Sequence, residues 1–178
     1  MKNSNQIYLL QVCVIVTSLL ISTNFTYAQA KEITANDKFY WLNLGLGGST
    51  VGEDGSAALN LNATYQFGRN VLSLRALKNA ALFKKEIEEY GLLYGLALTS
   101  PPFLASFGGG VAVVSGTIDH SPFSPDEKID PTIGLPLEVQ LFWRPFRLTG
   151  VGLYGFANVN SEESYVGGTI GLQFGKLR

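Results

Sequence analysis

AALNLNATYQF, residues 57–67, alternates without interruption between two kinds of residue. The odd positions carry alanine, leucine, tyrosine and phenylalanine, whereas the even positions from Asn60 onward carry asparagine, threonine and glutamine. Successive side chains of a strand point to opposite faces of its sheet. This stretch therefore predicts a strand with one apolar and one polar face. The same period of two recurs, in clear or weaker form, at 39–48, 70–78, 87–98, 132–143 and 165–174.

Eight strands are predicted in all. Two of them are apolar or glycine on both faces, so their orientation stays open. A short helix within 76–89 (ALKNAALFKKEIEE) is an alternative, because its residues favour helix. The two strands whose faces cannot be assigned are 103–117 and 148–159. The full set of predicted strands is 39–48, 56–67, 70–78, 87–98, 103–117, 132–143, 148–159 and 165–174.

The first thirty residues have the composition of a secretory signal peptide, with a basic start and the apolar run 7–21. Small residues allow cleavage after Ala28 or after Ala30. A retained anchor is the alternative, although a transmembrane helix needs about 20 apolar residues. Cys13, the single cysteine, lies inside the run, so the exported domain 31–178 is expected to lack disulfides and thiolate sites.

The composition of the exported domain suits closely packed strands. Residues 1–30 contain one charged residue, Lys2, so the remainder has 12 basic and 14 acidic residues, a net charge of 12 − 14 = −2. A nucleic-acid partner is therefore not expected, because it requires a basic surface. All 20 glycines lie in the 178 − 30 = 148 residues that remain, about twice the usual share of roughly 7%.

The relative bulk of the two strand faces favours a barrel in lipid. A soluble sandwich or lipocalin buries its apolar face and exposes its polar face. Here leucine and aromatic residues fill the apolar faces, whereas glycine, asparagine, threonine and glutamine fill the polar faces. The interior of an eight-stranded barrel is just wide enough for side chains. Small polar residues inside and bulky apolar residues outside are thus expected, and a soluble periplasmic barrel that binds an apolar ligand is the alternative.

Link lengths and aromatic residues indicate which end of the barrel is which. The turns at 68–69, 100–102 and 145–147 are tight, whereas the links near 49–55, 79–86, 118–131 and 160–164 are longer and acidic, as in outer-membrane barrels. Aromatic residues near the tight turns are expected to form a girdle at the membrane–water interface. They are Tyr40, Trp41, Tyr65, Phe67, Phe103, Trp143, Phe146 and Phe174.

This pattern resembles the small outer-membrane barrels of the OmpA/OmpX type. The resemblance implies an all-β, eight-stranded antiparallel up-and-down transmembrane barrel with a structural, adhesive or surface-interaction role. It implies outer-membrane lipids and the barrel assembly machinery as partners, with the extracellular partner unidentified. The YAQA junction at 27–30 and the LQFGKLR ending at 172–178 are similar to barrels of the Bacteroidota.

Two residues depart from the family pattern. Such barrels commonly end on an aromatic residue, whereas Phe174 lies four residues before Arg178. Pro136 lies inside a predicted strand but cannot donate to a strand ladder. A bulge at Pro136, or a strand that extends above the membrane there, is therefore expected.

Charged residues on the predicted interior faces are the candidate site. Arg75 and Glu89 lie on neighbouring strands near a shared outer link and are close enough to meet, Glu138 lies nearer mid-barrel, and Arg144 ends its strand. Charged groups away from water are tolerated when they are paired. We expect a polar network that fills the interior, which excludes a general porin, and a narrow proton-accessible interior is the alternative.

Catalysis and metal binding have weaker support. Asp119-His120-Ser121 contains the single histidine, and histidine beside serine suits a lipid A acyl hydrolase or acyltransferase. Consecutive residues in a proline-rich loop do not converge as a triad requires, so no enzyme, catalytic residue or cofactor is predicted. The acidic links at Glu53-Asp54, Asp119–Asp130 and Glu162-Glu163 lack the spacing of a calcium loop, so no metal site is predicted.

Overall fold

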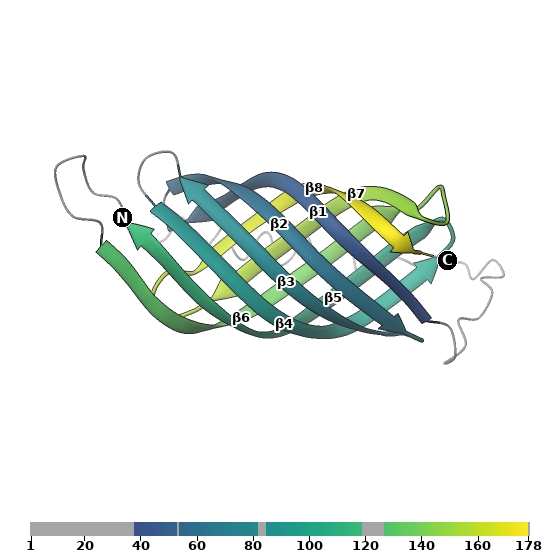
Figure 1. Cartoon of the computed structure of the whole chain (residues 1–178), viewed down its shortest axis with the longest axis horizontal. Helices are drawn as coiled ribbons and strands as arrows, with labels where there is room; N and C mark the ends of the chain where they lie inside the picture. The colour runs from purple at the N-terminus through teal and green to yellow at the C-terminus, as the bar shows by residue number, and fades with distance from the viewer. Residues whose placement is uncertain (1–37, 53, 82–84, 119–126, 178) are drawn as a thin grey trace, which may run out of the picture. The chain divides into compact units, whose positions relative to one another are not determined.

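Eight antiparallel strands follow one another around a closed barrel (Figure 1). The computed structural model describes residues 38–52, 54–81, 85–118 and 127–177. Each strand pairs with its neighbours in sequence, and the last strand pairs with the first. The predicted up-and-down barrel is confirmed. Its strands are β1 (Lys38–Val51), β2 (Asp54–Phe67), β3 (Asn70–Ala81), β4 (Lys85–Ser100), β5 (Phe103–Ile118), β6 (Glu127–Trp143), β7 (Thr149–Val159) and β8 (Tyr165–Lys176).

Most strands run further than the alternation alone indicated. The helix considered within 76–89 is wrong for the described residues, because β3 reaches Ala81 and β4 begins at Lys85. The link between β1 and β2 is reduced to 52–53, so it is not one of the longer connections. The turn 144–148, which was predicted to be tight, has as many residues as the link 160–164, which was predicted to be long. The predicted contrast between tight and longer links therefore holds clearly only for the link 119–126. We call the end where β1 begins and β8 ends the termini end, and the opposite end the far end.

The outer surface of the barrel is apolar around its whole circumference. Every strand contributes large hydrophobic side chains that point away from the interior, and their exposed fractions run from 38% at Val151 to 75% at Ile133. The orientation of the two unassigned strands is now defined, with Phe107 of β5 and Leu153 of β7 facing outward. We call this surface the apolar belt. Its members include Leu42, Leu44, Leu46, Leu61, Leu74, Leu92, Val111, Leu137, Leu153 and Ile170.

The interior contains a polar middle between two apolar clusters. Asparagine, glutamine, serine, threonine and the charged side chains occupy the middle and are almost fully buried. The far-end cluster comprises Val51, Ala58, Leu77, Ile87, Val114, Tyr154, Phe156 and Tyr165. The termini-end cluster comprises Trp41, Val71, Ala97, Leu104, Phe142 and Leu177. Sequence reasoning expected small and amide side chains inside and did not foresee these clusters.

Glycines permit the close approach of neighbouring strands. A Cβ atom at Gly95 would lie 2.0 Å from the carbonyl oxygen of Phe107, and one at Gly110 would lie 2.0 Å from that of Leu92. A Cβ at Gly152 would lie 2.1 Å from the carbonyl oxygen of Leu141. Because the obstructing atoms are backbone, a side chain would require the strands to separate. These positions explain part of the high glycine content, since a narrow barrel needs strongly coiled strands.

Pro136 fits the β6 strand without a bulge, which corrects the prediction made for it. The pairs Gly109↔Leu137 and Ala112↔Gly134 keep one register on either side of it. The register of β5 and β6 instead shifts between Val114 and Gly116. Pro136 also lies among the pairs that β6 forms with β7, opposite Asn158. It is thus part of the barrel wall, near the point where the pairing of β6 with β7 begins.

Candidate functional site

Arg75 and Glu89 form a buried ion pair inside the barrel. The Nε and Nη2 atoms of Arg75 lie 2.7 and 2.6 Å from Oε1 of Glu89, and both side chains are 0% exposed. The second carboxylate oxygen of Glu89 accepts a hydrogen bond from Asn158 Nδ2 at 2.8 Å and another from the Tyr165 hydroxyl. Nη1 of Arg75 donates to the carbonyl oxygen of Leu137 at 3.0 Å. Five strands, β3, β4, β6, β7 and β8, therefore meet at this pair.

Glu138 lies in the same polar middle and is held by neutral donors. Its Oε1 accepts hydrogen bonds from Ser73 Oγ and Gln140 Nε2, each at 3.1 Å. Its Oε2 accepts from Asn62 Nδ2 at 3.1 Å and from the Tyr154 hydroxyl. An ionised carboxylate accepts at both oxygens and matches this set of donors. Glu138 is 3% exposed, so hydrogen bonds from these protein side chains replace the water that its carboxylate loses on burial.

Amide side chains continue the network from Glu138 toward the termini end. Gln140 donates to Glu138 and accepts, through Oε1, a hydrogen bond of 3.0 Å from Asn43 Nδ2. Asn43 lies opposite Gln173 in the register of β1 and β8. The network thus crosses the barrel from β6 to β1, which joins strands that are not neighbours in the sheet.

Arg144 is the charged residue at the termini end of the interior. Its Nε donates to Gln173 Oε1 at 2.8 Å, and its Nη1 donates to the carbonyl oxygen of Leu177 at 3.2 Å. The guanidinium carbon lies 4.4 Å from the centre of the Trp41 ring, a cation–π arrangement. Among the described residues, no carboxylate lies within 4.0 Å of it.

The four charged residues singled out from the sequence thus all lie inside the barrel. Two of them, Arg75 and Glu89, are in contact. Sequence reasoning missed their aromatic partners Tyr154 and Tyr165. For Tyr154 the missing signal was the orientation of β7, whose residues are apolar or glycine on both faces, whereas Tyr165 is the first residue of β8 and points into the interior.

The aromatic residues expected at the interface lie at the termini end, with one exception. Trp41 is only 2% exposed and belongs to the interior, so its assignment to the girdle is corrected. The physical reason is the strand period, because the consecutive residues Tyr40 and Trp41 cannot both point outward. Phe67 is half-buried, and the remaining members face outward with exposed fractions from 40% to 67%. These are Tyr40, Tyr65, Phe103, Trp143, Phe146 and Phe174.

The other sequence candidates do not form a site in the described part of the chain. Asp119, His120 and Ser121 lie outside the described residues, as do residues 1–37 with the expected leader. In the link 160–164, Asn160 Oδ1 accepts hydrogen bonds from the backbone nitrogens of Glu162 and Glu163. No cluster of histidine, cysteine, aspartate or glutamate among the described residues could hold a metal ion.

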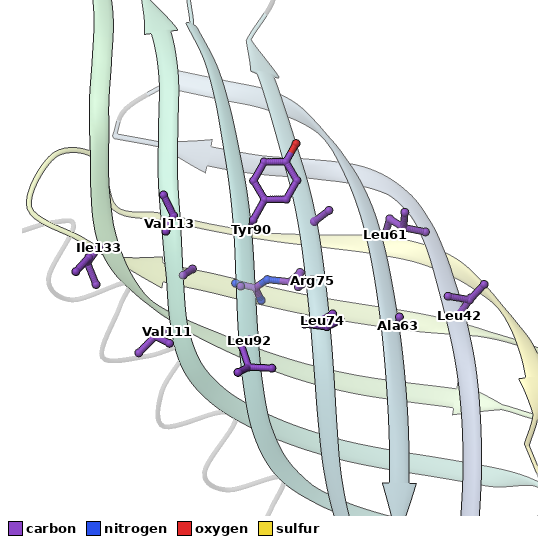
Figure 2. Close-up of a pocket in the computed structure, with 13 residues that line it drawn as sticks. Leu42, Leu61, Ala63, Leu74, Arg75, Tyr90, Leu92, Val111, Val113 and Ile133 are labelled. Carbon is purple, nitrogen blue, oxygen red and sulfur yellow. The ribbon is translucent and has the colours of Figure 1, made fainter.

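One shallow groove of about 790 Å³ crosses the apolar belt (Figure 2). Its floor includes the small side chains of Ala63 and Ala76. Figure 2 shows larger apolar side chains on several adjacent strands around this region. The lining is almost purely apolar and includes Leu42, Leu61, Leu74, Tyr90, Leu92, Val111, Val113 and Ile133.

Comparison with solved structures shows the fold. Neisserial surface protein A has a TM-score of 0.62 at 8% identity, over 77% of this chain and 96% of that one. The N-terminal barrel domain of Pseudomonas aeruginosa OprF has a TM-score of 0.57 at 11% identity, over 76% and 96%. The attachment invasion locus protein Ail of Yersinia pestis has a TM-score of 0.56 at 10% identity, over 77% and 96%.

The fold of this chain is therefore that of the small eight-stranded barrels. No family model matches the chain, and neither does any curated protein. Among the described residues, no helix is long and apolar enough to cross a membrane.

Proposed function

We propose that this chain is an integral outer-membrane β-barrel protein with a structural, adhesive or surface-interaction role and a closed interior. The observation that carries the proposal is the apolar belt. A monomeric soluble protein rarely exposes a contiguous apolar patch of more than a few hundred square ångströms. Here large hydrophobic side chains are exposed on all eight strands.

Closure of the barrel supports the membrane location. Lipid offers no partners for the N–H and C=O groups of an open sheet edge. Pairing of β1 with β8 from Tyr40↔Lys176 to Val51↔Tyr165 removes that edge. We propose that acyl chains of outer-membrane lipids cover the belt and fill its groove.

The packed interior supports a non-porin role. The polar middle and both apolar clusters consist of side chains that are at most 6% exposed. An eight-stranded barrel has room for side chains but not for an aqueous channel. The barrel is therefore proposed to act through its surface, and no arrangement of described residues supports catalysis.

The far end supports a role in surface interaction. β6 begins at Glu127, but its pairing with β7 begins only at Leu135. By contrast, β5 pairs with β4 as far as Lys85↔Ile118 and with β6 as far as Ile118↔Glu127. The sheet thus extends further on this side, and this extension is proposed to face the cell exterior.

Cell fractionation tests the location. The full chain is expressed in a Gram-negative host, and membranes are washed with alkaline carbonate before separation by density. We expect to recover the protein in the outer-membrane fraction. Its gel mobility is expected to differ before and after boiling, because a closed barrel resists unfolding by detergent until it is heated. Recovery in the aqueous periplasm without detergent would overturn it.

A further inference from the structure

Arg144 carries a buried positive charge that no described carboxylate balances. The residue is 1% exposed, and the oxygens that accept from its guanidinium belong to the neutral groups of Gln173 and Leu177. A buried charge without a counter-charge is strongly unfavourable. Arg75, the other interior arginine, has Glu89 as its partner. Among the described residues, Arg144 thus has no carboxylate that balances its charge.

Three buried hydrogen-bond donors at this position lack an acceptor within the described part of the chain. They are Arg144 Nη2, Trp41 Nε1 and Gln173 Nε2. All three belong to one contact group, because the Trp41 ring lies 4.4 Å from the guanidinium carbon and the Gln173 amide bonds to Arg144 Nε. A protonated guanidinium and an indole nitrogen can only donate. The group thus combines a buried positive charge with three donors that lack an acceptor among the described residues.

The surroundings are apolar and favour a small occupant. Trp41 belongs to the termini-end cluster together with Phe142, Leu104 and Leu177, whose exposed fractions are 2%, 1% and 0%. Low polarity strengthens the attraction between opposite charges. The close packing of these side chains disfavours a lipid headgroup or another large anion.

We propose that Arg144, Trp41 and Gln173 form a binding site for a small monovalent inorganic anion of halide size. The guanidinium supplies the charge, and Nη2, the indole N–H and the amide N–H supply hydrogen bonds. Leu177 closes the site, since its carbonyl oxygen accepts from Nη1 and its backbone nitrogen donates to the backbone carbonyl oxygen of Arg147 at 3.0 Å. The anion would stabilise the termini end of the barrel, because it would neutralise the buried charge of Arg144.

Tryptophan fluorescence can report on this site directly. The chain has two tryptophans, and Trp143 is exposed on the belt. Trp143→Phe therefore leaves Trp41 as the single emitter. We expect bromide to quench its emission with a saturable dependence in detergent micelles at constant ionic strength. Chloride is expected to reverse the quenching by competition, whereas gluconate, which is too large, is expected to leave it unchanged.

Two further variants, each in the Trp143→Phe background, separate the site from general quenching. Arg144→Gln is expected to abolish the saturable component. Arg147→Gln, on the exposed part of the same turn, is expected to retain it. Gel mobility before and after boiling checks that each variant is folded. Linear quenching without saturation in the Trp143→Phe protein, or saturation that chloride fails to reverse, would overturn the proposal even if Arg144→Gln does not fold.

Discussion

Two carboxylates, those of Glu89 and Glu138, accept most of the side-chain hydrogen bonds described in the polar middle of the barrel. Glu89 accepts hydrogen bonds from Arg75, Asn158 and Tyr165, and Glu138 accepts from Asn62, Ser73, Gln140 and Tyr154. Their donors come from five of the eight strands. A carboxylate at such a position specifies which strands face each other across the interior.

Removal of the Glu138 carboxylate is expected to destabilise the barrel strongly. Glu138→Ala leaves four buried donors without their acceptor, and breaking a buried charged network costs roughly 3–5 kcal/mol. Urea unfolding in detergent micelles measures the change. Glu88→Ala is the control, because its carboxylate is 38% exposed and its partner Lys78 also contacts Glu86. We expect at most about 0.5 kcal/mol for the control, and equal losses in both variants would contradict the assigned role of Glu138.

Sequence alone could place these residues inside the barrel but could not identify their partners. Strand parity puts Glu138 on the interior face of β6, and the same period of two continues to Arg144, the first residue after that strand. Parity also excludes Trp41 from the surface, although its aromatic character suggested the membrane interface. The contacts of Glu138 with Asn62 and Ser73 cross the barrel between strands that are far apart in sequence. Such contacts depend on closure and register, which no local pattern encodes.

At the scale of strands, glycine determines how closely neighbours approach. Gly95 of β4 lies opposite Gly108 of β5, so two residues without side chains face each other at this point. Gly155 on the outer face of β7 differs, because a Cβ there would lie 3.9 Å from its nearest neighbour, the Val139 carbonyl oxygen. The high glycine content therefore has more than one cause.

Gly95→Ala is expected to destabilise the barrel by roughly 1–3 kcal/mol or more, as overpacking does. Its Cβ would collide with the backbone of β5, which cannot move as a flexible side chain can. Gly155→Ala adds the same atom on the outer surface and is expected to be neutral. Urea midpoints of both variants, measured side by side, provide the test. A neutral Gly95→Ala variant would show that the close approach of β4 and β5 is described wrongly.

A charge in the apolar belt distinguishes lipid from water as the surrounding medium. Leu74 of β3 is 61% exposed, so Leu74→Arg would be nearly neutral in a soluble protein. In a bilayer it is expected to cost about 2–4 kcal/mol. Ala80→Arg lies on the same face of β3 beyond Lys78 and is expected to change little. Unfolding from lipid vesicles measures both, and equal stabilities would argue against a lipid-covered belt.

The number and direction of strands were predictable, whereas the orientation of β5 and β7 was not. Alternation of large apolar and small polar residues fixed the faces of β2, β4 and β6. In β5 and β7 glycine and apolar residues occupy both faces, because these strands contribute Leu104, Tyr154 and Phe156 to the interior clusters. Hydrophobicity alone cannot separate a cluster residue inside the barrel from a belt residue outside it.

For the whole molecule, the two apolar clusters predict a barrel that does not conduct. Purified protein in a planar lipid bilayer is expected to give no stepwise currents, and vesicles that contain it are expected to retain small sugars. The reason is that side chains fill the cross-section at both ends and in the middle. Discrete conductance steps of the kind porins give would contradict the closed interior.

The central claim, an outer surface in lipid around a closed interior, is tested most directly by spin labels along β6. Single cysteines are introduced in a Cys13→Ser background at the outward positions Leu137, Val139 and Leu141 and at the inward positions Gln140 and Phe142. Collision rates with oxygen, which dissolves in lipid, and with a water-soluble nickel complex are then measured in vesicles. A lipid-covered belt around a closed interior predicts high oxygen accessibility at the three outward positions and low accessibility to both reagents at the two inward ones. Outward positions that are more accessible to nickel than to oxygen would contradict it.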